Sequence, residues 1–164
     1  MHSRLVFIGG LAAIALLGAA CGASTQSQAG TSPAPIAASP SPAATGATVA
    51  VANDSKLGQI LVDGSGRTLY LFVADSGSAS TCYTSCAQIW PPVLTTGAPK
   101  AGTGATASLL GTTARTDGTT EVTYAGHPLY YFVSDKKPGD TTGQGVNGFG
   151  GLWYVLSPAG MQIS

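Results

Sequence analysis

Short runs of apolar residues between glycine-rich turns predict β-strands over residues 54–164. Residues 59–63 are predicted to form a first strand, which the turn at residues 63–66 ends. Residues 67–74 carry apolar side chains on both faces, so we expect an interior strand, antiparallel to the first and covered from both sides. A single helical turn is expected within residues 82–89, because two prolines follow Trp90 and stop any continuation.

The central feature of the chain is a seven-residue pattern that occurs twice, 60 residues apart. Residues 69–75 read Leu-Tyr-Leu-Phe-Val-Ala-Asp, and residues 129–135 read Leu-Tyr-Tyr-Phe-Val-Ser-Asp. A tryptophan follows each copy, Trp90 in the first half and Trp153 in the second. The large aromatic residues are expected in the core, where burial of each contributes roughly 1.5–3 kcal/mol.

The second half repeats the plan of the first, with a hairpin predicted over residues 114–124, an aromatic strand over 127–134 and a final strand over 152–156. The repeats cover about residues 55–100 and 108–162. Neither half has enough apolar residues to fold comfortably alone. We therefore expect a mainly β fold, in which two tandem repeats of antiparallel strands form a single pseudo-symmetric domain.

The N-terminal region has a different composition and resembles a bacterial export signal. In residues 1–20, Arg4 precedes an apolar run that is shorter than the roughly 20 residues of a membrane-spanning helix. The sequence Leu-Leu-Gly-Ala-Ala-Cys resembles a lipobox, in which the cysteine, here Cys21, is acylated with chains such as palmitate and becomes the new N-terminus. Gly18 stands where lipoboxes usually carry leucine, so plain secretion stays open as the alternative.

Residues 21–53 are predicted to be a lipidated cysteine followed by a disordered tether. Residues 22–52 contain no charged and no aromatic residue and consist almost entirely of Ala, Ser, Thr, Pro, Gly and Gln. Such a segment buries too little apolar surface to offset its ordering entropy. We expect it to hold a domain of residues 54–164 off the membrane.

Charge excludes some partners. After removal of residues 1–20 the seven basic residues become six, and all seven acidic residues remain. A nearly neutral chain has no electrostatic surface for nucleic acid and no polybasic attraction to lipid headgroups. We therefore expect attachment through the N-terminal lipid alone, on the extracytoplasmic side of the cell membrane, with a secreted protein as the alternative.

Cys82 and Cys86 remain as a pair once Cys21 is lipidated. Outside the cytoplasm two such thiols normally oxidise, so we expect a disulfide. Their C-x3-C spacing differs from the C-x2-C of thiol–disulfide exchange enzymes, and with His127 they make an incomplete metal-ligand set. No metal and no cofactor is predicted. Redox or metal-handling use of the two cysteines is kept as the alternative function.

Two further patterns bear on catalysis. Tyr70 and Asp75 would lie about 16 Å apart on a straight strand, with their side chains on opposite faces, and the same holds for Tyr130 and Asp135. Neither copy can therefore form a catalytic dyad by itself, and any joint function must arise between the copies. Residues 143–148 fit GxGxxG, but no helix and no acidic residue follow, so dinucleotide binding is rejected.

Together, these motifs resemble the bacterial lipoproteins known as secreted repeats of unknown function. The resemblance rests on the two copies, the Cys-x3-Cys-Ala-x2-Trp-Pro-Pro segment and the Gly-Asp-x2-Gly-Gln-Gly loop, and it covers about residues 55–162. It implies a lipid-anchored protein of the cell envelope and supplies no established activity. We expect a non-enzymatic structural or ligand-binding module, with an envelope component or small molecule as ligand and no assigned catalytic residue. The family signature falls on Tyr70, Phe72, Asp75, Tyr130, Phe132 and Asp135.

Overall fold

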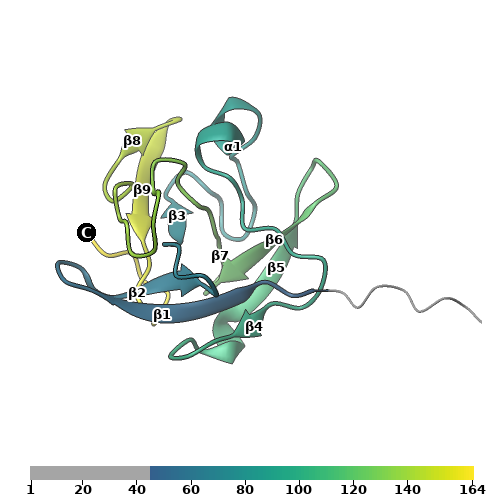
Figure 1. Cartoon of the computed structure of the whole chain (residues 1–164). Coiled ribbons are helices and arrows are strands. Elements are labelled where there is room, and N and C mark those ends of the chain that lie inside the picture. The colour runs from purple at the N-terminus through teal and green to yellow at the C-terminus, as the bar shows by residue number, and fades with distance from the viewer. Residues whose placement is uncertain (1–44) are drawn as a thin grey trace, which may run out of the picture. The chain divides into compact units, whose positions relative to one another are not determined.

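The computed structural model describes residues 45–164, which fold into a β-rich domain (Figure 1). The signal sequence, Cys21 and most of the predicted tether lie outside the described residues. The elements within residues 45–164 are β1 Thr48–Asp54, β2 Gly58–Asp63, β3 Tyr70–Phe72, α1 Ser85–Ile89, β4 Lys100–Ala101, the 3-10 helix η1 Ala107–Leu109, β5 Leu110–Ala114, β6 Thr120–Tyr124, β7 His127–Pro128, β8 Asn147–Gly148 and β9 Gly151–Val155.

The strands form three small sheets, with strand orders β2-β1-β4, β3-β9-β8 and β5-β6-β7. Neighbouring strands are antiparallel, except that β4 runs parallel to β1. Figure 1 shows β1 and β2 at the bottom of the view, with β3 and β9 beside each other above them. The mainly β fold predicted from the sequence is confirmed.

Strand β1 corrects the predicted start of the domain. It begins at Thr48, inside the stretch predicted to be tether, so the folded part starts before residue 54. Val49 is fully buried within an apolar cluster, and β1 pairs with β2 from Val49 to Asp54. The composition of residues 45–53 resembles that of the tether, but two valines at alternating positions suffice for a strand once a partner lies beside it.

Both aromatic strands are shorter than the sequence predicts. The N–H of Asp75 donates to the carbonyl of Phe72 (3.1 Å), and that of Asp135 donates to Phe132 (3.2 Å). A tight turn therefore follows each phenylalanine. Strand β3 ends at Phe72, whereas the second copy forms only β7 at His127–Pro128 and isolated bridges at Tyr130. The first turn leaves Val73 half exposed where burial was expected. Within β3 the prediction of an interior strand is correct, because all three residues are buried and its two faces contact different apolar clusters.

The two repeats are interleaved. Tyr70 and Tyr130 exchange a pair of backbone hydrogen bonds, each 2.9 Å long, so the two aromatic strands meet at equivalent positions. The segment after each tryptophan then lies beside the aromatic strand of the other repeat: Val155 pairs with Tyr70, and Pro92 pairs with Tyr130. Each repeat thus completes the other, and the result is one pseudo-symmetric domain.

Candidate functional site

The signature tyrosines and aspartates bond across the boundary between the repeats. The Tyr70 hydroxyl donates to Asp135 Oδ2 at 2.7 Å, and the Tyr130 hydroxyl donates to Asp75 Oδ2 at 2.7 Å. The aspartate that each tyrosine binds is therefore the one supplied by the other copy. The interleaving of the repeats thus supplies each tyrosine with the aspartate of the other copy.

Each signature aspartate also closes the loop that follows its own strand. Asp75 Oδ1 accepts hydrogen bonds from the N–H and the hydroxyl of Thr81, both at 2.8 Å. Asp135 Oδ1 accepts the same pair from Thr142, at 3.0 and 2.5 Å. One carboxylate oxygen thus holds the loop of its own repeat, while the other accepts a hydrogen bond from the tyrosine of the opposite repeat.

Four aromatic rings stack at the centre of the domain, in the order Phe72, Trp153, Trp90 and Phe132; we call them the aromatic stack. Ring centroids are 4.0 Å apart for the first two contacts and 4.2 Å for the third, and the tryptophan planes differ by 3°. Both tryptophans are at most 1% exposed. The stack is therefore core packing between the repeats and offers no open platform to a sugar or peptide ligand.

The two signature tyrosines are held in their protonated form. Each packs edge-on against one tryptophan, with ring centroids 5.4 Å apart for Tyr70 and Trp90. Burial raises the pKa of Tyr70 far above its ordinary value, and the hydrogen bond to Asp135 raises it further. Burial raises the pKa of Tyr130 as well, together with the negative charge of Glu121. Both hydroxyls remain donors at neutral pH.

A buried chain of polar groups continues from Tyr130 into the second hairpin. Ser80 Oγ lies 2.7 Å from the Tyr130 hydroxyl and accepts from Arg115 Nη1 at 2.7 Å. The same Nη1 donates to Glu121 Oε2 at 2.7 Å, and Nη2 donates to the carbonyl of Cys82 at 2.7 Å. A guanidinium inside the domain therefore ties the β5–β6 hairpin to the loop that leads into α1.

Sequence reasoning missed Arg115 and Glu121. The β1–β2 hairpin of the first repeat corresponds to the β5–β6 hairpin of the second. Ala52 pairs with Ile60 in the first hairpin, and Thr113 pairs with Glu121 in the second. Glu121 therefore takes the position that a buried isoleucine has in the first repeat. Glutamate is rarely fully buried unless paired. The one available signal was a carboxylate between apolar neighbours in a predicted strand, and nothing in the sequence identified the arginine as its partner.

Glu121 is the most perturbed carboxylate within residues 45–164. Its side chain is 0% exposed, and its Oε1 atom has no hydrogen-bond partner in this part of the chain. Burial raises the pKa of Glu121 to about 7, although the neighbouring Arg115 pulls it down. Burial also raises the pKa of Asp75, which the hydrogen bonds from Tyr130 and Thr81 offset only in part.

Cys82 and Cys86 form the expected disulfide, with their Cα atoms 5.2 Å apart. The two residues are 0% and 6% exposed, so the bond lies in the core beside Trp90. Among residues 45–164, no group of three or more His, Cys, Asp or Glu side chains is arranged to hold a metal ion. His127 lies on β7, paired with Tyr124.

The glycine-rich loop packs against the aromatic residues. The N–H of Gly143 donates to the Tyr70 hydroxyl at 3.2 Å. A Cβ atom at this position would lie 2.8 Å from a ring carbon of Trp90 and 2.9 Å from one of Tyr70. The loop leads into β8 and β9, where a dinucleotide fingerprint requires a helix. The glycine therefore allows close packing, and a side chain there would collide with the core.

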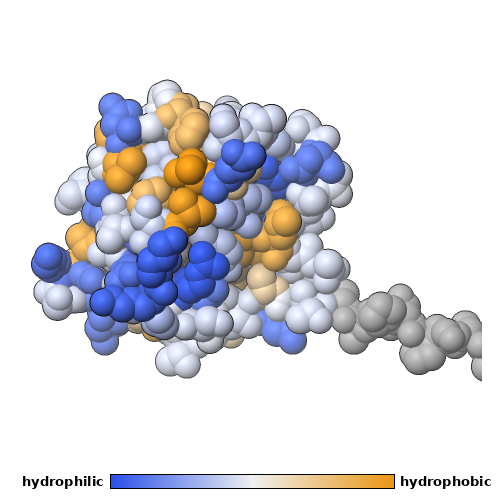
Figure 2. All heavy atoms as spheres, turned by 45° about the horizontal axis from the view of Figure 1, so that its top comes forward, coloured by the Kyte–Doolittle hydropathy of each residue, from blue (hydrophilic) through white to orange (hydrophobic). Residues whose placement is uncertain are grey.

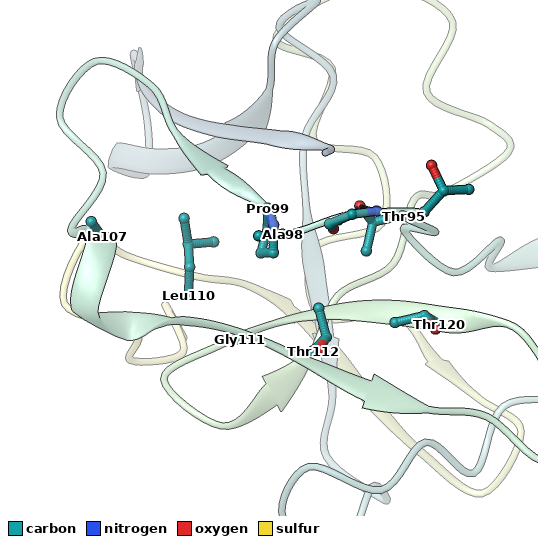
Figure 3. A pocket seen from close by; sticks show the side chains of 10 residues that line it. Thr95, Ala98, Pro99, Ala107, Leu110, Gly111, Thr112 and Thr120 are labelled. Atoms are coloured by element: carbon teal, nitrogen blue, oxygen red, sulfur yellow. Dashed lines mark hydrogen bonds between the residues drawn. The ribbon is translucent and has the colours of Figure 1, made fainter. Parts of the chain in front are cut away.

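The surface offers two hollows, of about 530 and 570 Å³, on either side of Thr95 and Thr96. Figure 3 shows the first, with Ala98 and Pro99 on one side and Thr112 on the other. None of the signature residues lines either hollow. Figure 2 shows a small group of apolar residues in the middle of the α1 face, with polar residues beside it.

These features define a class: a β domain of two interleaved repeats that exchange tyrosine–aspartate bonds across a shared aromatic stack. Residues 51–94 and 111–157, more than half of the chain, match the family described as "Secreted repeat of unknown function". The chain belongs to this family, and it is an extracytoplasmic protein of unknown molecular activity. No curated protein and no solved structure matches it. Within residues 45–164, no helix has the length and hydropathy needed to cross a membrane.

Proposed function

We propose that the protein is a lipid-anchored, non-enzymatic module of the cell envelope that acts by binding or by its structure. The observation that carries this proposal is the use of the signature residues. Tyr70, Tyr130 and the aromatic stack are occupied with one another, and each signature aspartate is bonded to a tyrosine and a threonine. The signature residues therefore hold the two repeats together. Any binding function then belongs to other residues, at the surface of the domain.

The protonation states of the buried side chains also support a non-enzymatic role. A general acid or base works best when its pKa lies near the ambient pH. Burial moves the pKa of both signature tyrosines away from neutrality. Glu121 has a pKa near neutrality, but it is 0% exposed and lines neither of the two hollows beside Thr95 and Thr96. The burial of these three side chains favours a role in the stability of the domain.

The redox alternative is weaker because its sulfur atoms are enclosed. Thiol–disulfide exchange requires a thiolate to approach a disulfide sulfur in line. Cys82 and Cys86 are almost completely buried, and the carbonyl of Cys82 is held by Arg115. We infer that the disulfide fixes the loop before α1 and that the surrounding core shields it from exchange.

Anchoring is proposed from the lipobox at Cys21. Each buried methylene of an acyl chain contributes about 0.8 kcal/mol, and several chains together give a stable attachment. The near-neutral charge of the mature chain supplies no second means of attachment to lipid headgroups. Lipid on Cys21 would therefore account for all of the membrane affinity.

The test is Cys21→Ser in the full chain, followed by carbonate washing of membranes and intact-mass measurement under thiol labelling. We expect the wild type to carry acyl chains and no labelled thiol, and the variant to leave the membrane fraction. A Cys82→Ser/Cys86→Ser double variant serves as the control and should stay with the membrane. Retention of Cys21→Ser would contradict the anchor, and labelling of native wild type after mild reduction would favour the redox alternative.

A further inference from the structure

We propose that the outer edge of β5 is a docking site for an extended polypeptide segment of small, uncharged residues, which adds to the β5-β6-β7 sheet as a fourth strand. The inference specifies the partner of the proposed binding function and rests on it. It is independent of the lipid anchor.

The first repeat shows how such an edge is filled. The connector between the repeats, residues 100–103, lies parallel to β1. The N–H of Gly102 donates to the carbonyl of Val49 at 2.7 Å, and the N–H of Val51 donates to Thr103 at 2.9 Å. The chain's own small-residue connector therefore serves as the added strand.

Strand β5 is the counterpart of β1 in the second repeat. The carbonyls of Leu61 and Val122 each accept the N–H of the leucine that opens the signature, at 3.0 Å in both repeats. Their partners across the two hairpins are Val51 and Thr112. Thr112 therefore occupies the position at which Val51 donates to the connector.

Within residues 45–164, nothing fills the equivalent edge of β5. Among these residues β5 pairs with β6 alone, and no backbone bond joins its other side to a neighbouring strand. In this part of the chain, the outward N–H of Thr112 and carbonyl of Leu110 have no counterpart of the bonds that Val51 and Val49 make to the connector. The strand reads Leu-Gly-Thr-Thr-Ala and has none of the charges or prolines that commonly protect sheet edges. An unpaired edge of this kind accepts an added strand.

The hollow beside β5 indicates the side chains of the occupant. It holds about 530 Å³ and is lined by threonine, glycine, alanine, proline and leucine, so a neutral segment fits it best. On β1, a Cβ at Gly102 or Gly104 of the connector would come within 2.9 Å of Ala50 or Val51. Thr112, β-branched like Val51, imposes similar crowding on β5. Glycine and alanine are therefore expected where the segment passes close to the strand (Figure 3).

The test uses the purified full chain in detergent with a peptide that copies residues 98–105 with alanine in place of Lys100, Ala-Pro-Ala-Ala-Gly-Thr-Gly-Ala. Amide hydrogen exchange of β5 is measured with and without peptide at millimolar concentration. We expect exchange at Thr112 to slow severalfold in the wild type and in Thr112→Val, which keeps the N–H. Thr112→Pro removes that N–H at an exposed edge position, where proline is tolerated, and should abolish the peptide's protection of the remaining amides of β5.

A second probe leaves the protein unchanged, so the test does not depend on the folding of a variant. A peptide N-methylated at the position of Gly102 cannot donate to the edge and should not protect β5. The proposal is overturned if the parent peptide gives no protection, or if the methylated peptide protects equally well. Protection of β5 without peptide in a dimeric protein would make a second copy the occupant, and this would also overturn it. None of these outcomes bears on the fractionation of Cys21→Ser.

Discussion

At the scale of single residues, the Glu121–Arg115 pair is the least expected feature of the domain. Two opposite charges lie inside the β-rich domain, where removal from water is costly unless the pair is close and otherwise hydrogen-bonded. Arg115 meets this condition through Glu121, Ser80 and the carbonyl of Cys82, whereas Glu121 retains one unpaired oxygen. The pair therefore gives the core a group that titrates near neutral pH.

The stability of the domain should depend on the protonation of Glu121. The folded-state pKa is raised from the ordinary 4.5 to about 7, so the folded protein binds this proton more tightly than the unfolded chain. The stabilisation is complete below about pH 4.5 and is lost as the pH rises through about 7. We expect the free energy of unfolding to fall on the order of 2 kcal/mol between roughly pH 5 and pH 8.

Glu121→Gln removes this titration and leaves Asp75, Ser80, Tyr130 and Arg115, the groups that face it, in place. Urea unfolding of wild type and variant at several pH values measures the difference in slope. A variant with the same pH dependence as the wild type would show that another group titrates.

The residue types that connect the two repeats were predictable from the sequence, but their hydrogen-bond partners were not. The signature tyrosines and aspartates could be identified because the same seven-residue pattern occurs twice in the sequence. A disulfide between Cys82 and Cys86 followed from their number and compartment. The arginine–glutamate pair left no such trace, since Arg115 directly follows β5, Glu121 lies on β6, and the first repeat lacks the pair.

At the scale of elements, hairpins and turns were predicted well and strand ends poorly. The β5–β6 hairpin and the stop after Trp90 follow from local glycine and proline chemistry. Strand β1 was missed because small residues carry little pattern, although its pairing with β2 buries Val49. The aromatic segments turn early because the N–H groups of Asp75 and Asp135 bond to the carbonyls of the preceding phenylalanines, and the alternation of apolar residues does not indicate this turn.

The glycine-rich loop should tolerate a methyl group at one glycine and reject it at another. Gly143→Ala places a carbon within 3.0 Å of rigid rings of Trp90 and Tyr70, so we expect a loss of about 1–3 kcal/mol in unfolding free energy. Gly148→Ala is the matched control, because nothing lies within 4 Å of the position that its methyl group would take, and its effect should stay within about 1 kcal/mol. Thermal or urea unfolding compares the two. Equal destabilisation would show that loop flexibility, and not core contact, limits this segment.

At the scale of the whole molecule, two tandem repeats make one domain by exchanging segments. The sequence predicted a single pseudo-symmetric domain from the shortage of apolar residues in each half. It did not predict that the segment after each tryptophan crosses to the other repeat, because a strand pattern does not specify its partner strand. The exchange explains why the signature recurs: each copy needs the aspartate and the tryptophan of the other.

The central claim is that Tyr70 is bonded to Asp135 of the other repeat, and a double-mutant cycle tests it most directly. Tyr70→Phe is combined with Asp135→Ala in one cycle and with Asp75→Ala in the other, and unfolding free energies are measured for all variants. The two aspartates lose matching threonine contacts, so the cycles differ chiefly in the tyrosine bond. We expect a coupling energy of about 1–3 kcal/mol for Tyr70 with Asp135 and a clearly smaller one with Asp75. Stronger coupling of Tyr70 to Asp75, within its own repeat, would contradict the interleaved joint.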